Sequence, residues 1–317
     1  MGEGSGEGDY GRNEPLTLPL SPVGGEGIVL RDLLTQDTGA RSDMQKLSFT
    51  KMSGSGNDFV MIDNRNGRLD VEPRTLAKRI CPRGLSVGAD GVILVEPSSK
   101  ADFRMRIFNA DGSEAEMCGN GGRCVARFAE MLGIAGPRMA FETLAGIIRA
   151  EVHGTRVKLQ ISQPHDLRLR QSIEVDGVVH QLHSINTGVP HAVIFCSDLE
   201  EVAVRALGRQ IRFHPAFQPA GTNVDFVAAL NSKGLVIRTY ERGVEDETLA
   251  CGTGAVASAL VAASLGLVSS PVQVRVRSGE TLTVHFSGNG PEFREVFFEG
   301  EVRLIYQGEL MEEALLA

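Results

Sequence analysis

The sequence has no excess of basic residues, no Cys-x-x-Cys pair and no Gly-Lys-Ser/Thr motif. Lys and Arg number 32 against 40 Asp and Glu, a formal net charge of −8 over 317 residues. Binding to nucleic acid is therefore not expected, because neutralising phosphates requires a basic face. Without these cysteine and P-loop patterns, neither a zinc site nor a nucleotide cofactor is expected.

The cysteines are odd in number and scattered, which does not fit the disulfide framework of a secreted domain. They are Cys81, Cys118, Cys124, Cys196 and Cys251. A lone buried cysteine is usually inert packing, and we interpret Cys81, Cys124 and Cys196 in this way. The other two stand in a repeated motif and need a different explanation.

The first 45 residues differ in composition from the rest of the chain. They hold eight acidic residues, three basic residues and nine glycines. Such a segment cannot bury enough apolar surface to offset its chain entropy, so we expect it to be mostly disordered, with at most a short helix over 28–34. It lacks the basic start and apolar core of a secretory signal and is too acidic for a usual transit peptide. A cytoplasmic protein is expected.

Residues 249–268 contain no charge and are numerous enough to cross a bilayer. However, the run includes Ser258 and Ser264 and starts with a Cys-Gly-Thr-Gly turn, so its transfer free energy into lipid is weak. A helix that is apolar all round belongs inside a folded domain. We expect a buried helix and no membrane span.

An internal repeat organises the chain. Residues 117–134 (MCGNGGRCVARFAEMLGI) and 250–267 (ACGTGAVASALVAASLGL) share seven identities in eighteen positions. The alignment extends upstream, since Asp90 and Asn223 each lie 28 residues before the motif cysteine of their copy. Each copy then reads as strand, strand, acidic turn, Cys-Gly-x-Gly and helix. Two copies longer than 100 residues indicate two similar domains.

We therefore expect an α+β fold of two similar domains, each a curved, mostly antiparallel sheet around one central apolar helix. Further strand-like runs are 152–161, 272–276 and 281–286. A doubly wound parallel sheet is disfavoured, because too few amphipathic helices alternate with the strands. The expected division is an extension over 1–45, an N-terminal half over 46–163 and a C-terminal half over 164–303, with residues 304–317 packing back on the N-terminal half.

A cysteine at a helix start lies beside free backbone N–H groups and the positive end of the helix dipole. We expect both to lower the pKa of the thiols of Cys118 and Cys251. The same N–H groups form a cradle for a carboxylate. Two repeat-related sulfurs facing one cavity suit a reaction in which one thiolate removes an α-proton and the opposite thiol returns a proton to the other face. No residue pattern implies pyridoxal phosphate or a metal.

The chain resembles the diaminopimelate epimerases over nearly all of residues 46–310. Seven blocks carry the resemblance in order: 49–60 (FTKMSGSGNDFV), 88–91 (GADG), 108–113 (FNADGS), 117–123 (MCGNGGR), 186–191 (NTGVPH), 221–226 (GTNVDF) and 240–254 (YERGVEDETLACGTG). One block alone is a weak signal, whereas seven in order are specific. Met44 stands where the chains of this family usually begin.

The resemblance implies a cofactor-independent isomerase that interconverts LL- and meso-diaminopimelate in lysine and peptidoglycan precursor synthesis. It implies a small-molecule substrate and raises the expectation of a homodimer. Cys118 and Cys251 match the acid/base cysteines, and His191 matches a supporting residue. The matching substrate-binding positions are Asn57, Asn109, Gly119, Asn120, Asn223, Glu241, Arg242, Gly252 and Thr253. Arg242 can clamp a carboxylate and Glu241 can pair with an ammonium group, as a substrate with two amino-acid ends requires.

The chain departs from the family pattern at Gly91, Val189, Tyr240, where Trp is frequent, and Asp246, an extra residue in its loop. Many members have Gln in place of Gly91 and Asn in place of Val189, and both are substrate contacts in those members. Alternative interpretations are a proline racemase-like enzyme, a thiol redox switch that pairs Cys118 with Cys251, and a binding protein on the same scaffold. Proline racemases usually have His where Asn120 stands, and retention of both cysteines argues against a binding protein.

Overall fold

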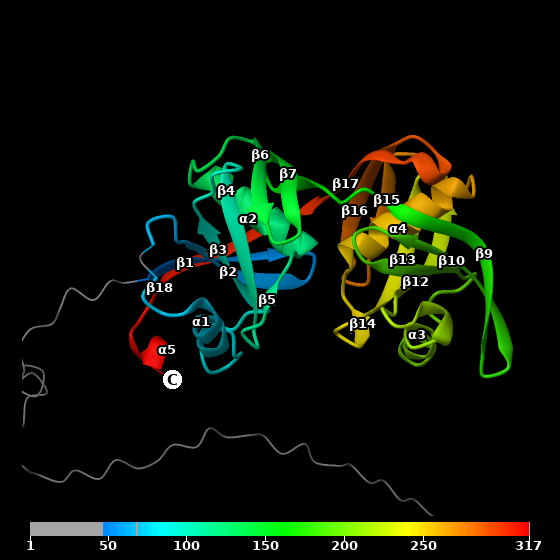
Figure 1. The fold of residues 1–317 in the computed structure, drawn as a ribbon, viewed down its shortest axis with the longest axis horizontal. Helices are drawn as coiled ribbons and strands as arrows, with labels where there is room; N and C mark the ends of the chain where they lie inside the picture. Colours follow the sequence, from blue (N-terminus) through cyan, green and yellow to red (C-terminus); the bar gives the residue numbers. More distant parts are fainter. Residues whose placement is uncertain (1–46, 68, 317) are drawn as a thin grey trace, which may run out of the picture. The chain divides into compact units, whose positions relative to one another are not determined.

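A computed structural model describes residues 47–67 and 69–316. The expected acidic extension over 1–45, with its helix over 28–34, lies outside these residues. The described chain is mainly β-structure with two long buried helices, drawn in Figure 1.

The first half of the chain surrounds helix α2. Its helices are α1 (Pro73–Ile80) and α2 (Gly119–Met131). Its strands are β1 (Leu47–Gly54), β2 (Asn57–Asp63), β3 (Gly91–Glu96), β4 (Phe103–Asn109), β5 (Glu114–Ala115), β6 (Arg138–Thr143), β7 (Gly146–His153) and β8 (Arg156–Gln160).

The second half repeats the plan around helix α4. Its helices are α3 (Val204–Arg212) and α4 (Gly252–Ser264), with short 3-10 turns η1 (Pro215–Phe217) and η2 (Gly290–Glu292). Its strands are β9 (His165–Val175), β10 (Val178–Asn186), β11 (Pro190–Phe195), β12 (Asn223–Asn231), β13 (Gly234–Glu241), β14 (Asp246–Thr248), β15 (Val272–Arg275), β16 (Thr281–Ser287) and β17 (Arg294–Glu301).

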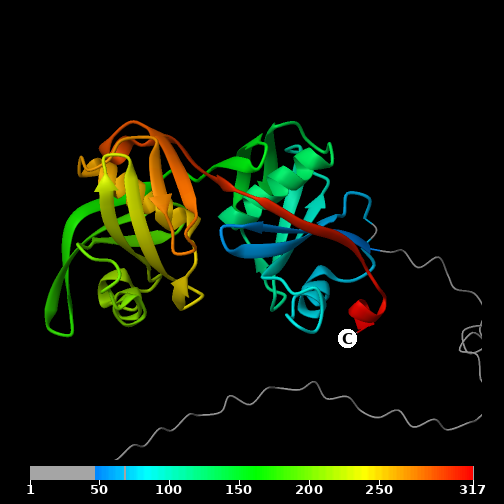
Figure 2. The ribbon, with the colours of Figure 1, turned by 180° about the vertical axis from the view of Figure 1, so that it is seen from behind.

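The final strand, β18 (Arg303–Leu310), pairs antiparallel with β1 and is followed by α5 (Glu313–Leu316). β17 pairs with β16 of the second half and with β8 of the first. Figure 2 shows the two strands in succession, running from the second half to the first. The two halves are therefore joined by continuous backbone hydrogen bonding.

Strand pairing confirms the repeat. The parallel pairs β2–β3 and β4–β6 of the first half correspond to β11–β12 and β13–β15 of the second. The other strand pairs of the described chain are antiparallel. The expected α+β fold, with mostly antiparallel sheets around central helices, is confirmed.

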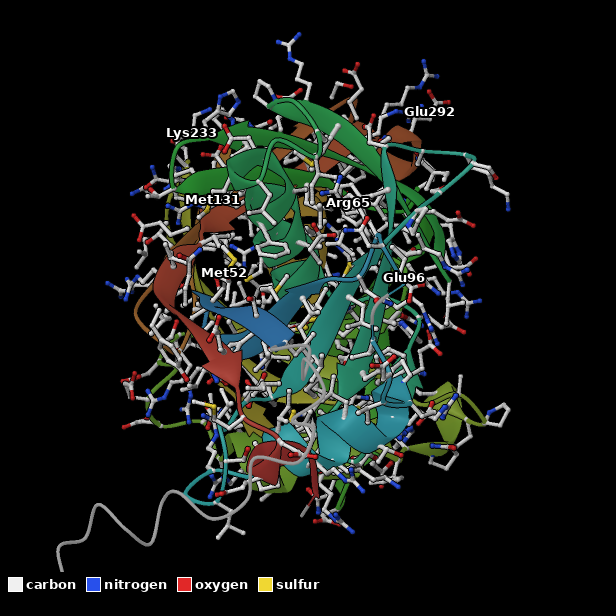
Figure 3. All side chains as sticks on the ribbon, turned by 90° about the vertical axis from the view of Figure 1, so that its left-hand side faces the viewer. Met52, Arg65, Glu96, Met131, Lys233 and Glu292 are labelled. Atoms are coloured by element: carbon white, nitrogen blue, oxygen red, sulfur yellow. The ribbon has the colours of Figure 1, made fainter. Side chains whose placement is uncertain are left out.

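The two central helices share one core. Ten of the thirteen residues of α4 are buried, as the apolar run predicts. Val125 and Phe128 of α2 belong to the same apolar cluster as Val256 and Leu260 of α4. Met52 of β1 is completely buried in it, whereas Met131 at the end of α2 is 39% exposed; both are labelled in Figure 3. Each fully buried side chain of this size stabilises the fold by about 1.5–3 kcal/mol.

No helix within residues 47–67 and 69–316 combines the length and apolar character needed to cross a membrane. The uncharged run at 249–268 contains α4, which is a core helix.

Two local expectations were incomplete. The strand-like run at 152–161 contains the turn between β7 and β8, where Gly154 has a φ of +62°. Helices α1 and α3 were not expected, because each is too short to give a long periodic pattern. Helix α1 has a readable start: Pro73 is its first residue, and the Glu72 carboxylate accepts a hydrogen bond from the Thr75 N–H at 2.9 Å.

Helix α3 packs so closely on β13 that Gly208→Ala should destabilise the protein. A Cβ at Gly208 would lie 2.5 Å from the Cβ of Tyr240. The better helix propensity of Ala, worth about 1 kcal/mol, is smaller than the cost of overpacking, so we expect a net loss of about 1–2 kcal/mol in the free energy of unfolding. Urea unfolding measures this. Gly136→Ala, with open space around its Cβ, is the control; equal stability of both variants would contradict the packing argument.

Candidate active site

The two motif cysteines occupy equivalent helix starts. Cys118 is the N-cap of α2 and Cys251 is the N-cap of α4, both with extended backbone. The Cys118 sulfur accepts a hydrogen bond from the Gly121 N–H at 3.5 Å. The Cys251 sulfur lies 3.4 Å from the Thr253 hydroxyl. Both thiols are free.

The ring of Phe298 on β17 brings the two helix starts together. A Cβ at Gly119 would lie 2.8 Å from Cζ of this ring, and a Cβ at Gly252 would lie 3.0 Å from its Cε2. Phe298 itself is 1% exposed. Glycine after each cysteine is thus required for both helices to approach one aromatic ring, and the two cysteines are placed in one region of the protein.

The expected lowering of the thiol pKa values is wrong for this structure. Burial raises the pKa of the Cys118 thiol, and the N–H groups of Gly121 and Asn120 oppose that effect only in part. Burial also raises the pKa of the Cys251 thiol well above its usual range, and the carboxylates of Glu241 and Asp225 add to the effect. Loss of solvation outweighs the helix terminus, because burial disfavours the charged thiolate more than the N–H groups stabilise it.

Glu241 connects the two thiols electrostatically. It ends β13, and its negative charge raises the pKa of both Cys118 and Cys251. Burial raises the pKa of Glu241 itself. One carboxyl group therefore acts on both sulfurs, as expected of a group in a shared site.

A buried polar chain leads away from Cys251. His191 and Asp225 are both 0% exposed, and Nδ1 of the imidazole lies 2.7 Å from the carboxylate. Nε2 of His191 lies 3.0 Å from Oγ1 of Thr253, which in turn contacts the Cys251 sulfur. A carboxylate only accepts, so Nδ1 of His191 donates to Asp225. With the proton on Nδ1, Nε2 is left to accept from the Thr253 hydroxyl.

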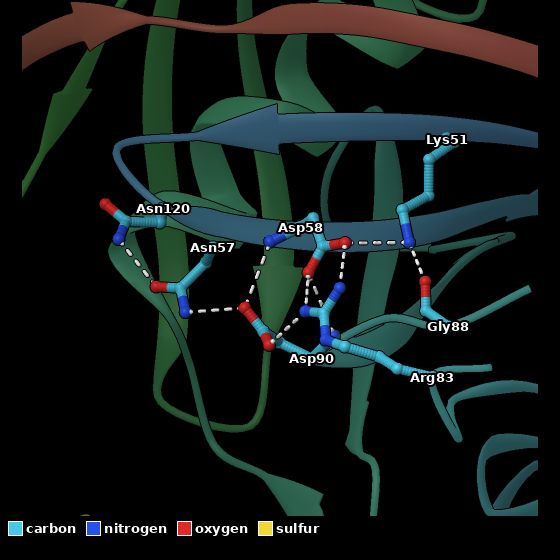
Figure 4. Close-up of polar contacts among 7 residues, drawn as sticks. All are labelled: Lys51, Asn57, Asp58, Arg83, Gly88, Asp90 and Asn120. Atoms are coloured by element: carbon cyan, nitrogen blue, oxygen red, sulfur yellow. Dashed lines mark hydrogen bonds and ion pairs between the residues drawn. The ribbon is translucent and has the colours of Figure 1, made fainter. Parts of the chain in front are cut away.

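A second polar chain leads away from α2, and Figure 4 shows it. The Asn120 side-chain amide donates to Oδ1 of Asn57 at 2.8 Å, and the Asn57 amide donates to Asp90 at 3.0 Å. Since Asp90 only accepts when ionised, the orientation of both amides follows from this contact. Each of these two side-chain amides has a second N–H, which can donate to a carboxylate.

The far end of this chain is an ion-pair cluster. Arg83 contacts Asp58 and Asp90, and Lys51 lies 2.8 Å from Asp58 and donates to the Gly88 carbonyl. Although burial opposes the effect, hydrogen bonds from Arg83 and Lys51 lower the pKa of Asp58 to about 2. Arg83 thus binds both carboxylates, and Asp90 in turn accepts from the Asn57 amide and holds it in place.

Three further predicted residues lie at strand ends. The Asn223 side chain donates to the Pro190 carbonyl at 3.0 Å and accepts from the Arg242 N–H at 2.8 Å. The Arg242 guanidinium donates to the Ala220 carbonyl at 2.9 Å. Asn109 is exposed, and its amide donates to Ser113, so it is not bonded to the two polar chains.

Two of the departures from the family pattern, at Gly91 and Val189, have different settings. A Cβ at Gly91 would lie 2.5 Å from the Phe108 carbonyl oxygen, so a longer side chain there requires a backbone shift. Val189 follows a turn in which Asn186 accepts from the Gly188 N–H at 2.9 Å. The Val189 carbonyl accepts from the Thr187 N–H at 3.1 Å, whereas its side chain is apolar.

Sequence reasoning missed Phe298, the role of Asp225 beside His191, and the surroundings of Arg123. Phe298 has no motif, because its contact with two glycines arises only when β17 packs against both helices. Arg123 did carry a signal, since its counterpart in the second repeat is the apolar residue Val256.

The candidate site is identified by its reactive side chains, because the pocket near the end of α2 does not include them. A pocket of 820 Å³ lies between β1, β18 and the end of α2, where Phe49, Phe128 and Leu315 line it, and neither motif cysteine contributes to it. In the described part of the chain, no three His, Cys, Asp or Glu side chains are grouped so as to hold a metal ion.

Comparison with known proteins agrees with the motif pattern. The profile of the diaminopimelate epimerase family matches residues 49–164 and again 183–305. The chain is 48% identical to the diaminopimelate epimerase of Aquifex aeolicus over 281 residues, which cover 85% of this chain and 99% of that protein. It is 45% identical to that of Archaeoglobus fulgidus over 248 residues, covering 74% and 88%.

Solved structures with similar folds are more distant in sequence. A phenazine biosynthesis protein of the PhzF family from Bacillus anthracis has a TM-score of 0.62 at 15% identity, covering 84% of this chain and 100% of that one. A hydroxyproline epimerase from Agrobacterium vitis has a TM-score of 0.62 at 17% identity, covering 84% and 93%. These likenesses show a shared fold. The family assignment rests on the profile match to both repeats and on relatives that are 45–48% identical to this chain. The chain belongs to the diaminopimelate epimerase family of isomerases.

Proposed function

We propose that this protein interconverts LL- and meso-diaminopimelate without a cofactor, in lysine and peptidoglycan precursor synthesis, with Cys118 and Cys251 as its two acid/base groups. The observation that supports this most directly is the convergence of two repeat-related cysteine helix starts on the ring of Phe298. Inverting a stereocentre by proton transfer requires one base on each face of the reacting carbon.

The proton steps balance without any other reactant. The thiolate of one cysteine takes the proton from Cα, and the electron pair of the broken C–H bond remains on the carbon and its carboxylate. The thiol of the other cysteine then donates its proton to the opposite face and becomes a thiolate. After turnover the two sulfurs have exchanged protonation states, so the reverse reaction uses them in the opposite roles.

Negative charge on the reacting carboxylate needs donors close by. We assign this role to the backbone N–H groups at Gly119 and Asn120 and at Gly252 and Thr253, which begin the two helices. The second amino-acid end of the substrate would use Glu241 for its ammonium group and Arg242 for its carboxylate. Asn57, Asn109 and Asn223 supply further amide contacts.

His191 acts as a supporting residue in this scheme. Its imidazole is buried between Asp225 and Thr253 and does not contact a cysteine directly. By binding the Thr253 hydroxyl it orients the group that lies beside the Cys251 sulfur.

We also propose a division into halves at residues 163–164, with residues 304–317 belonging to the first half. The connection from β8 to β9 at 161–164 and the pairing of β18 with β1 support it. A homodimer through β18 is the proposed assembly, because among the described residues the strand that pairs with β18 is β1, and β18 exposes three consecutive apolar residues, Leu304, Ile305 and Tyr306. A reducing compartment such as the cytoplasm would keep both thiols active.

Replacing either motif cysteine should abolish epimerisation. Cys118→Ala and Cys251→Ala each remove one of the two proton carriers, so we expect kcat to fall by at least about 10²–10⁴-fold. A coupled or chiral assay of LL-diaminopimelate conversion measures this. Cys196→Ala is the control, since this half-buried thiol lies outside the site. Full activity in either motif variant would exclude the two-base mechanism.

The substrate assignment is tested by α-proton exchange in D₂O with diaminopimelate and proline side by side. The Glu241–Arg242 pair suits a second amino-acid end, which proline lacks, so we expect deuterium at Cα of diaminopimelate only. Proton NMR follows the loss of the Cα signal, with Cys118→Ala as the blank. Exchange with proline alone would overturn the assignment.

Removing the charge of Glu241 should make both thiols easier to ionise. The carboxylate raises the pKa of Cys118 and of Cys251, so Glu241→Gln should lower the pH midpoint of iodoacetamide alkylation at both sites, by about 1 pH unit or less. Peptide mapping by mass spectrometry separates the two cysteines. Glu245→Gln is the matched control, because Glu245 lies on the loop that follows Glu241 and its carboxylate pairs with Arg212 of α3. Unchanged midpoints in Glu241→Gln would show that this carboxyl group does not act on the sulfurs.

A further inference from the structure

Arg123 is a buried cation without an ionic partner. Its side chain is 0% exposed, and within the described residues no carboxylate lies within ion-pair distance of it. Its Nε has no hydrogen-bond partner in the described chain. Burying a guanidinium in this way is unfavourable, so a requirement other than stability is expected to maintain it.

The contacts that Arg123 makes are to neutral groups. Nη2 donates to the Ser55 hydroxyl at 2.8 Å and to Oδ1 of Asn120 at 2.6 Å. The guanidinium carbon lies 5.2 Å from the centre of the Phe298 ring, the ring that both helix starts approach. Glycine at position 300 makes space for the guanidinium, because a Cβ there would lie 1.9 Å from Nη1 of Arg123.

The contact with Asn120 determines which way that amide points. A guanidinium only donates, so it binds the amide oxygen and turns the Nδ2 group toward Asn57. Asp90 selects the same direction from the other end of the chain. Arg123 and Asp90 together hold both asparagine amides in one orientation.

The charged surroundings of Arg123 point to the function of its charge. The ionisable groups that act on it are Cys118 and Cys124 from its own helix, Glu280 from the turn before β16 and Arg156 from β8. The groups that act on Cys118 are Glu241, which disfavours the thiolate, and Arg123, which favours it. In the second repeat the position equivalent to Arg123 is Val256, so Cys251 has no corresponding cation.

We propose that Arg123 is a positioning residue of the epimerase reaction, which orients the Asn120 amide and places a buried positive charge on the helix that Cys118 begins. The inference rests on the proposed role of Cys118 as an acid/base group. It predicts that the two repeat-related cysteines differ: the pKa of Cys118 depends on the charge of Arg123, whereas the pKa of Cys251 does not.

Arg123→Met tests the charge, with Arg123→Lys as the variant that retains it. We expect the pH midpoint for iodoacetamide alkylation of Cys118 to rise by about 1 pH unit in Arg123→Met and to return most of the way in Arg123→Lys. The midpoint of Cys251 in the same samples should not move. With substrate, Arg123→Met should also raise KM, because the Asn120 amide is no longer held.

Arg127→Met is the matched control. Arg123 donates from Nη1 to the Glu301 carbonyl at 3.4 Å. Arg127 lies one turn further along α2 and donates to the neighbouring carbonyl of Val302, but no hydrogen bond joins it to Asn120 in the described chain. It should leave the Cys118 midpoint unchanged. If Arg123→Met does not fold, as judged by circular dichroism, Arg123→Gln gives the same test with a neutral side chain that still donates to Asn120.

The outcomes separate this inference from the proposed function. An unchanged Cys118 midpoint in the neutral variants, or an equal shift at both cysteines, would overturn the role of Arg123. Alkylation is measured without substrate, so that result would leave the two-base mechanism intact. An active Cys118→Ala variant would instead reject the proposed function, whatever the midpoints.

Discussion

The packing of two helix starts on the Phe298 ring is the constraint on which the rest of the site depends. The ring can touch both helices only because glycine follows each motif cysteine, and any side chain at Gly119 or Gly252 would enter the ring's volume. β17 can present the ring to both because it is hydrogen-bonded to β8 on one side and to β16 on the other. The placement of the cysteines is therefore a property of the shared sheet and not of either half alone.

Burial at this contact determines the electrostatics. It raises the pKa of both thiols, and the hydrogen bonds and the Arg123 charge that act against it offset it only in part. The repeat then departs from symmetry at two buried positions. Arg123 of the first copy corresponds to Val256 of the second, and Asp225 of the second corresponds to Val92 of the first. In addition to the effect of Glu241 on both thiols, Arg123 lowers the pKa of Cys118 and Asp225 raises that of Cys251, so the two repeat-related sulfurs have distinct environments.

Much of the fold and part of the site could be predicted from the sequence. The paired Cys-Gly-x-Gly helices, the strands before Asn109 and Glu241, and the mostly antiparallel character are all local patterns that the structure retains. Short helices such as α3 could not be predicted, because their amphipathic pattern covers too few residues. The sign of the thiol pKa shift was also wrong, since a helix terminus is visible in sequence whereas loss of solvation depends on every segment that covers the sulfur.

The sequence by itself determined which residue types stand at the two helix starts, because a repeated Cys-Gly motif and an apolar helix are written in consecutive residues. Only the tertiary structure decided what surrounds them. Phe298, Arg123 with Ser55, and His191 with Asp225 come from segments far apart in the chain, and their contacts exist only after the strands have paired. Hydrogen bonds and burial depend on groups that lie within a few ångströms of one another in space. The spacing of residues along the chain fixes such distances only within a single helix or strand, so contacts between distant segments cannot be predicted from it.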